Sequence, residues 1–183
     1  MKTLTKGLLL SIYLLICINL FAQSNTNLKS TLKQEVKMED VETQEKNKEI
    51  IRKLYDECYN KGKFDLLKDI VAEDFTGAGG QKGAAGFAEP VKVLAQAFPD
   101  IKFTIEHLVA EGDLVVARSY WKGTHTASFR NFPPTNKFVN GTGIGIYQLK
   151  NNKIVNIWLE TDRLGFWQQI DVLPQNIVPT PKK

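Results

Sequence analysis

The side chains best suited to proton chemistry lie close together near the end of the chain, at Glu160 and Asp162. Counting by twos along a strand puts both carboxylates on the face that carries Trp158. An aldol or enolisation step needs a base that removes a proton next to a carbonyl, and a donor for the oxygen that becomes charged. A carboxylate desolvated by an indole and other apolar groups can be that base. The pattern therefore makes Asp162 a candidate for the working acid of a pocket, with Trp158 and Glu160 on the same strand face.

A structural role for Asp162 is the alternative, because the sequence period changes directly after it. Leu164, Trp167 and Ile170 recur at helical spacing, so Asp162 lies at a helix start, where a carboxylate caps the first turn. Glu160 lies roughly 7 Å earlier along the strand, either as a second buried acid or as a charge on the pocket rim. The sequence leaves both pairs of alternatives open.

His125 is the other catalytic candidate, since it shares a strand face with Trp121 and can donate a hydrogen bond to a carbonyl oxygen. A structural role near the strand end is its alternative. His107 is the other histidine of the chain, and no His-x-His or His-x-x-x-His pair occurs, so no metal site is predicted. The serines lack a nucleophile elbow, which argues against a Ser/His/Asp hydrolase.

Helices followed by strands are expected to position these groups. Apolar residues recur at helical spacing in residues 47–59, 64–71 and 87–98, and they alternate in residues 101–109, 114–125, 138–149 and 154–162, before a closing helix. Pro90 is expected in or near the first turn of the third helix, where proline is tolerated. This order indicates an α+β fold: one domain over residues 46–175, with helices packed on a curved, mostly antiparallel four-stranded sheet.

The alternation also assigns side chains to the two faces of the sheet. One face of the first strand is expected to carry Ile101, Phe103, Ile105, His107 and Val109. On the last strand, Val155, Ile157 and Leu159 are expected opposite Trp158. Because these three are apolar where a solvated sheet would be polar, the outer face is expected to be covered, most simply by a homodimer.

Large aromatic side chains usually belong to the hydrophobic core. A row of them that is exposed would instead line a ligand-binding pocket. The residues predicted to bind a substrate are Trp158, Glu160, Trp121, Tyr147 and Phe87.

Two groups of glycines have separate interpretations. Gly141, Gly143 and Gly145 share one face of the third strand, which fits strong curvature or the close approach of a neighbour. The glycine-rich residues 76–86 are expected to form a mobile loop at the mouth of a pocket. A phosphate-binding loop is disfavoured because no Gly-Lys-Ser/Thr follows.

The start of the chain indicates export. Lys2 and Lys6 precede a short apolar run, and Ala22 offers a small residue for cleavage, which is the order of a secretory signal peptide over residues 1–22. A soluble periplasmic or secreted product is expected, with no membrane attachment after cleavage. Residues 23–45 are expected to be a flexible tether or a loosely helical arm because they are polar and lack aromatic side chains, and residues 176–183 a tail.

Removal of the signal peptide lowers the formal net charge from +4 to +2, and no basic stripe interleaved with aromatic residues is present. Nucleic acid is therefore not expected as a partner. Cys58 is the cysteine that remains, and its place on the apolar face of a helical pattern predicts a buried, inert thiol.

Several pieces of the chain resemble one family, in the expected order. They are Ala97-Phe98-Pro99-Asp100-Ile101, Ala110-Glu111-Gly112-Asp113, Gly123-Thr124-His125, Phe132-Pro133-Pro134-Thr135 and Trp158-x-x-x-Asp162-x-Leu164-Gly165-x-x-Gln168-Gln169. Together, over residues 47–170, they resemble the SnoaL-like polyketide cyclases, also called ester cyclases, of the NTF2-like superfamily.

The resemblance implies a cone-shaped α+β barrel that holds an apolar ligand. It implies an intramolecular aldol closure without metal or cofactor, in which the aspartate matching Asp162 is the general acid/base and the histidine matching His125 has a positioning role. The chain departs from the family at residues 77–80, where Gly-Ala-Gly-Gly replaces a histidine or another polar group, and in its export signal. Two functions stay open: a cofactor-free enzyme acting on a small apolar carbonyl compound, or a non-catalytic domain that binds a hydrophobic small molecule or a protein partner.

Overall fold

The computed structural model describes residues 33–35, 38 and 40–176. Contacts divide the chain into two units, Met1–Glu42 and Thr43–Lys183. The described residues of the first unit are helical and exposed. The predicted signal peptide lies outside the described residues, as do residues 23–32 of the predicted tether and nearly all of the predicted tail. No described helix is both long enough and apolar enough to span a bilayer.

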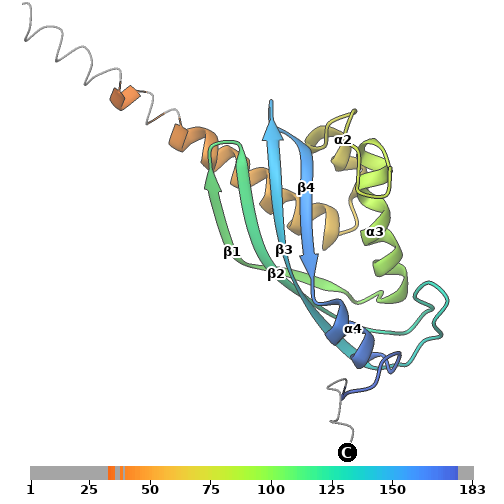
Figure 1. Ribbon diagram of the computed structural model, residues 1–183. Helices are drawn as coiled ribbons and strands as arrows, with labels where there is room; N and C mark the ends of the chain where they lie inside the picture. The colour runs from red at the N-terminus through yellow and green to blue at the C-terminus, as the bar shows by residue number, and fades with distance from the viewer. Residues whose placement is uncertain (1–32, 36–37, 39, 177–183) are drawn as a thin grey trace, which may run out of the picture. The chain divides into compact units, whose positions relative to one another are not determined.

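The second unit is an α+β fold, as the sequence predicts (Figure 1). Residues 43–53 are helical and continue into a π-helical turn, η1 (Leu54–Tyr59), and then η2 (Phe64–Leu66), α2 (Leu67–Ile70) and α3 (Gly83–Ala97) follow. The sheet consists of β1 (Lys102–Glu111), β2 (Leu114–Thr124), β3 (Phe138–Lys150) and β4 (Lys153–Thr161), and α4 (Arg163–Gln169) follows it. All neighbouring strands are antiparallel, and their order in the sheet is their order in the chain.

The third helix, α3, begins four residues earlier than the apolar period indicates. Pro90 therefore lies in the helix interior and not in its first turn, which corrects the sequence expectation. A proline ring clashes with the carbonyl four residues back, and that residue is Gly86. Gly86 also packs closely, because a Cβ there would lie 2.6 Å from the carbonyl carbon of Gln81.

A bulge in β1 corrects the predicted face of two residues. Ile105 pairs with Ser119 and His107 pairs with Arg118, so Glu106 is an extra residue in the strand. Beyond it the alternation inverts, because one inserted residue turns every later side chain to the other face. Val109 is consequently 62% exposed on the outer face, and the expectation that His107 and Val109 share the face of Phe103 is wrong.

A second bulge, in β4, corrects the face of Trp158 and Glu160. Leu149 pairs with Ile154 and Gln148 pairs with Asn156, which leaves Val155 as the extra residue. Trp158 consequently stands opposite Ile146, on the outer face of the sheet, and is 50% exposed. The residues expected on the outer face, Ile157 and Leu159, lie on the inner face instead.

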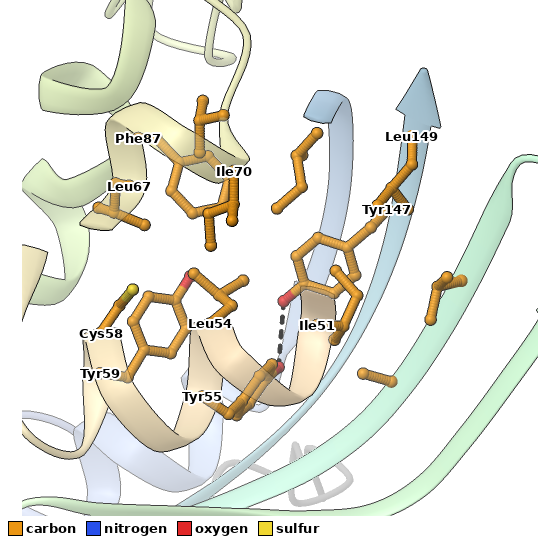
Figure 2. Packing of buried hydrophobic residues seen from close by; sticks show 14 of the residues in the cluster. Ile51, Leu54, Tyr55, Cys58, Tyr59, Leu67, Ile70, Phe87, Tyr147 and Leu149 are labelled. Carbon is orange, nitrogen blue, oxygen red and sulfur yellow. Dashed lines mark hydrogen bonds between the residues drawn. The ribbon is translucent and has the colours of Figure 1, made fainter. Parts of the chain in front are cut away.

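The core has two parts, and the larger one surrounds three buried tyrosines between the first helix and the sheet. Tyr55 of η1 and Tyr147 of β3 point toward one another (Figure 2), and their hydroxyl groups are 3.1 Å apart. The Tyr55 hydroxyl also lies 3.2 Å from Ser119 Oγ, so the buried oxygens satisfy one another. We call this the tyrosine core: Tyr55, Tyr59, Tyr147 and the apolar residues packed on them. Cys58 lies within it, fully buried, and burial raises the pKa of its thiol, as expected for an inert cysteine.

The smaller part of the core lies where α3 and α4 meet the other end of the sheet. Its buried members are Ala97, Phe98, Ile101, Val139 and Ile170. Partly buried aromatic side chains pack against it from β2, from the loop after β2 and from α4: Trp121, Phe129, Phe166 and Trp167. This aromatic layer is the part of the fold next to the candidate site.

Candidate functional site

A cavity of about 510 Å³ opens between α3, the inner face of the sheet and α4. Its apolar wall is largely the aromatic layer, with Val93 and Leu94 of α3 facing it. The rings are mutually supported, with centroids 5.2 Å apart for Phe129 and Phe166 and 6.0 Å apart for Trp121 and Phe166. Pockets of this volume with aromatic walls suit small, flat organic ligands.

Trp121 lies flat on the sheet because glycine stands opposite it. Trp121 pairs with Gly141 on β3, and a Cβ at that glycine would lie 2.5 Å from the indole Nε1. Gly145 likewise leaves room for the Tyr147 ring, because a Cβ at position 145 would lie 2.8 Å from the ring carbon Cε2. The predicted close approach of neighbours to these β3 glycines is confirmed.

Asp162 caps α4 and also lines the cavity, so the expected cap is confirmed, and a catalytic role stays a prediction. Its Oδ1 accepts a hydrogen bond from the Gly165 backbone N–H at 2.8 Å. A Cβ at position 165 would collide with Oδ2. The Asp162-x-x-Gly165 spacing therefore holds the carboxylate in its capping position, at the edge of the aromatic cavity.

Gln169 fixes α4 to the sheet and thereby fixes Asp162. Its side-chain amide donates to the Asn140 carbonyl at 2.8 Å and accepts from the Asn140 N–H at 3.0 Å. This pair of bonds joins the last turn of α4 to β3. Gln169 belongs to the motif that begins at Trp158 and ends in Gln168-Gln169, but the sequence did not indicate what its side chain does.

His125 lies behind the cavity wall and is not among the residues that line the cavity. It is fully buried and stacks on Phe98, with centroids 5.0 Å apart. Its Nδ1 accepts the Thr135 N–H at 3.3 Å, which places the proton of the neutral ring on Nε2. Burial lowers the pKa of this imidazole, and Nε2 has no partner among the described residues. His125 is therefore placed to support Phe98 and the loop after β2, and not to touch a ligand.

The other residues predicted to bind substrate lie elsewhere. Tyr147 and Phe87 are buried in the larger part of the core. Trp158 is on the outer face, and Glu160 lines a second, more open hollow formed by residues 159–164. Asp162 and Trp121 are the members of the predicted set that meet at the cavity.

Gln81 of the glycine-rich segment lines the cavity, and the loop is shorter than expected because α3 begins at Gly83; its expected mobility stays a prediction. An antiparallel bridge between Thr76 and Lys82 closes it, and the Gly77 N–H donates to the Gln81 carbonyl at 2.7 Å. Gln81 follows Gly79 and Gly80 directly in the chain. Its Oε1 accepts the Gly79 N–H at 3.1 Å.

Charged side chains missed by the sequence analysis also line the cavity: Glu89 on α3, Arg130 in the loop after β2, and Arg163 at the start of α4. Only tertiary structure brings these three segments together. Within the described part of the chain, no group of three or more His, Cys, Asp or Glu side chains is arranged to hold a metal ion.

Comparison with known proteins identifies the family. Residues 49–170 match the profile of the SnoaL-like polyketide cyclases. A candidate polyketide cyclase from Acidithiobacillus ferrooxidans is 34% identical, with a TM-score of 0.62 over 69% of this chain and 94% of that one. IdmH, a candidate polyketide cyclase from Streptomyces antibioticus, is 26% identical, with a TM-score of 0.59 over 69% of this chain and 99% of that one.

A candidate SnoaL-like polyketide cyclase from Jannaschia sp. CCS1 shares the fold at 22% identity, with a TM-score of 0.65 over 72% of this chain and 95% of that one. A search of curated proteins found no match.

Proposed function

This chain belongs to the SnoaL-like polyketide cyclase family, and from that premise we propose that it is a cofactor-free enzyme in which Asp162 moves a proton on a small apolar carbonyl compound. The observation that carries the proposal is the position of the Asp162 carboxylate at the edge of a cavity walled by aromatic rings. A base at such a place meets the carbon next to a carbonyl when a flat substrate lies against the rings.

The proposed step is enolisation, followed in a cyclase by attack of the enolate carbon on a second carbonyl of the same substrate. Asp162 takes the proton from the carbon and returns a proton to the oxygen of the new alcohol, so the enzyme ends as it began. Trp121 lines the same cavity, and its indole N–H is the proposed donor to the enolate oxygen. A bound substrate would exclude water from Asp162, which is exposed in the free protein.

His125 contributes as a positioning residue in this proposal. It stacks on Phe98, and Phe98 contacts Trp121 with ring centroids 5.3 Å apart. The imidazole therefore supports the indole from behind without reaching the substrate.

A non-catalytic binding domain is the second candidate, and one observation favours it. The Asp162 carboxylate already has a structural task as the cap of α4, which would explain its presence without any reaction. Such a domain would retain a hydrophobic small molecule, or a protein partner, whether or not residue 162 is an acid.

The test is proton exchange at an enolisable aromatic ketone, with 2-tetralone as the probe and NMR in deuterated water as the readout. Asp162→Asn is expected to lower enzyme-dependent exchange by about 100-fold or more, and the fold should survive because asparagine also caps helices. Glu160→Gln, which removes a carboxylate on the outer face, is the matched control and should leave exchange unchanged. Equal exchange in the wild type and Asp162→Asn would favour the binding domain.

A further inference from the structure

We infer that the cavity takes a flat aromatic compound that carries a carboxylate, and that Arg130 and Arg163 bind this carboxylate. The inference rests on the proposed function in using the same cavity, and it adds the class of ligand. The evidence is that some arginines of the chain form ion pairs with carboxylates, whereas the two at the cavity do not.

The chain has four arginines, and two of them are neutralised away from the cavity. Arg52 pairs with Glu49 at 2.5 Å, and Arg118 pairs with Glu106 across the outer face of the sheet. Arg130 and Arg163 both line the cavity and are exposed, and among the described residues the ion pairs of arginine are those of Arg52 and Arg118. Guanidinium groups that face a shared cavity without an internal anion are suited to bind one from a ligand.

Arg130 is held at the tip of a tight turn. Phe129 and Phe132 exchange backbone hydrogen bonds of 3.1 and 3.0 Å, and Arg130 between them has a φ of 54°, in the left-handed region. Its guanidinium carbon lies 5.6 Å from the centre of the Phe129 ring. This contact keeps the charged group beside the aromatic wall, where a carboxylate on a ring lying against that wall can reach it.

Arg163 is the first residue of α4, directly after Asp162. The helix that carries it is fixed to β3 through the two hydrogen bonds between Gln169 and Asn140. One segment thus presents an acid for proton transfer and a cation for anchoring. A ligand that satisfies both has a carbonyl group and a carboxylate on one flat skeleton.

Two acids also line the cavity, Glu89 and Asp162, and they would repel a purely anionic ligand. Asp162 already accepts one hydrogen bond from Gly165, and neither acid forms an ion pair with either arginine in the described residues. The guanidinium donors therefore remain available. The acids limit the anion to the part of the cavity that the arginines reach, which gives selectivity for position as well as for charge.

The test compares 2-naphthoate with its neutral analogue 2-naphthamide, by calorimetric titration of the full chain. The wild type is expected to bind the acid about tenfold more tightly than the amide, and rising salt should weaken binding of the acid only. Arg130→Gln and Arg163→Gln should each lower that preference severalfold. Lys122→Gln is the matched control, because it removes a positive charge from the outer face beside Trp121 and should leave the preference unchanged.

Equal affinity for the two probes, no binding of either at millimolar concentration, or a preference unaffected by both arginine variants would overturn the inference. Asp162→Asn separates this result from the proposed function. It should keep or strengthen naphthoate binding while losing proton exchange with 2-tetralone, so a failure of one activity leaves the other measurable.

Discussion

On the inner face of the sheet, an aromatic ring lies over a glycine at two places. One of these rings is buried in the core, and the other lines the cavity. Tyr147 lies over Gly145 and Trp121 lies over Gly141, each ring resting where a Cβ would collide with it. Tyr147 is 1% exposed because Tyr55 and its neighbours in the first helix close over it. Trp121 lines the open cavity between α3, the sheet and α4. The element that packs over the ring therefore decides whether an aromatic residue belongs to the core or lines a binding pocket.

The largest expected effect comes from placing a methyl group under each ring. Gly145→Ala should destabilise the fold by about 1–3 kcal/mol, because the buried Tyr147 ring has no room to move. Gly141→Ala should cost less than about 1 kcal/mol, because Trp121 can swing into the cavity, but it should abolish binding of 2-naphthoate. Urea unfolding and calorimetric titration measure the two effects. Equal losses of stability in the two variants would contradict the comparison.

The outer face provides the next test, because its row of exposed and half-buried apolar side chains has no cover in the described part of the chain. Val109, Val116, Ile146 and Trp158 lie opposite one another across all the strands. The expected homodimer remains a prediction, and the β4 bulge changes the residues that would form it. Trp158→Glu should weaken self-association in sedimentation velocity and leave 2-naphthoate binding intact. A wild-type protein that stays monomeric at tens of micromolar would contradict this expectation.

The smallest expected effect concerns the imidazole behind the cavity wall. Burial lowers the pKa of folded His125 below its ordinary value of 6.5, so the unfolded chain takes up this proton first as the pH falls. The contribution of His125 to stability is therefore complete above pH 6.5 and declines as the pH falls through that value toward the folded pKa, by at most about 1.4 kcal/mol per pH unit.

NMR titration of the histidine rings checks this expectation, with His107→Gln identifying the His125 signal, since the chain has only these two histidines. Thermal unfolding at pH 7.5 and 5.5 gives the accompanying change in stability. A His125 ring that titrates at or above the reference value would show that the imidazole is not buried as described.

Much of the fold was predictable because it depends on local periodicity. The α+β class, the order of helices and strands, the burial of Cys58 and the helix start at Asp162 all follow from apolar spacing and turn residues. The start of α3 was missed because its first turn, Gly83 to Gly86, contains no large apolar residue to reveal the helical period. The candidate site was predictable at Asp162 and Trp121, which lie on elements whose pattern is regular.

The sequence by itself determined which elements form and which acid starts the last helix. Tertiary structure decided which way several side chains face. A bulge inserts one residue into a strand and reverses the faces of the residues after it. Because β4 carries large apolar side chains on both faces, alternation could not show that Trp158 and Glu160 turn outward. Tertiary structure also brought Arg130 and Arg163 to one cavity, because the spacing of distant segments is set by packing, which no local pattern records.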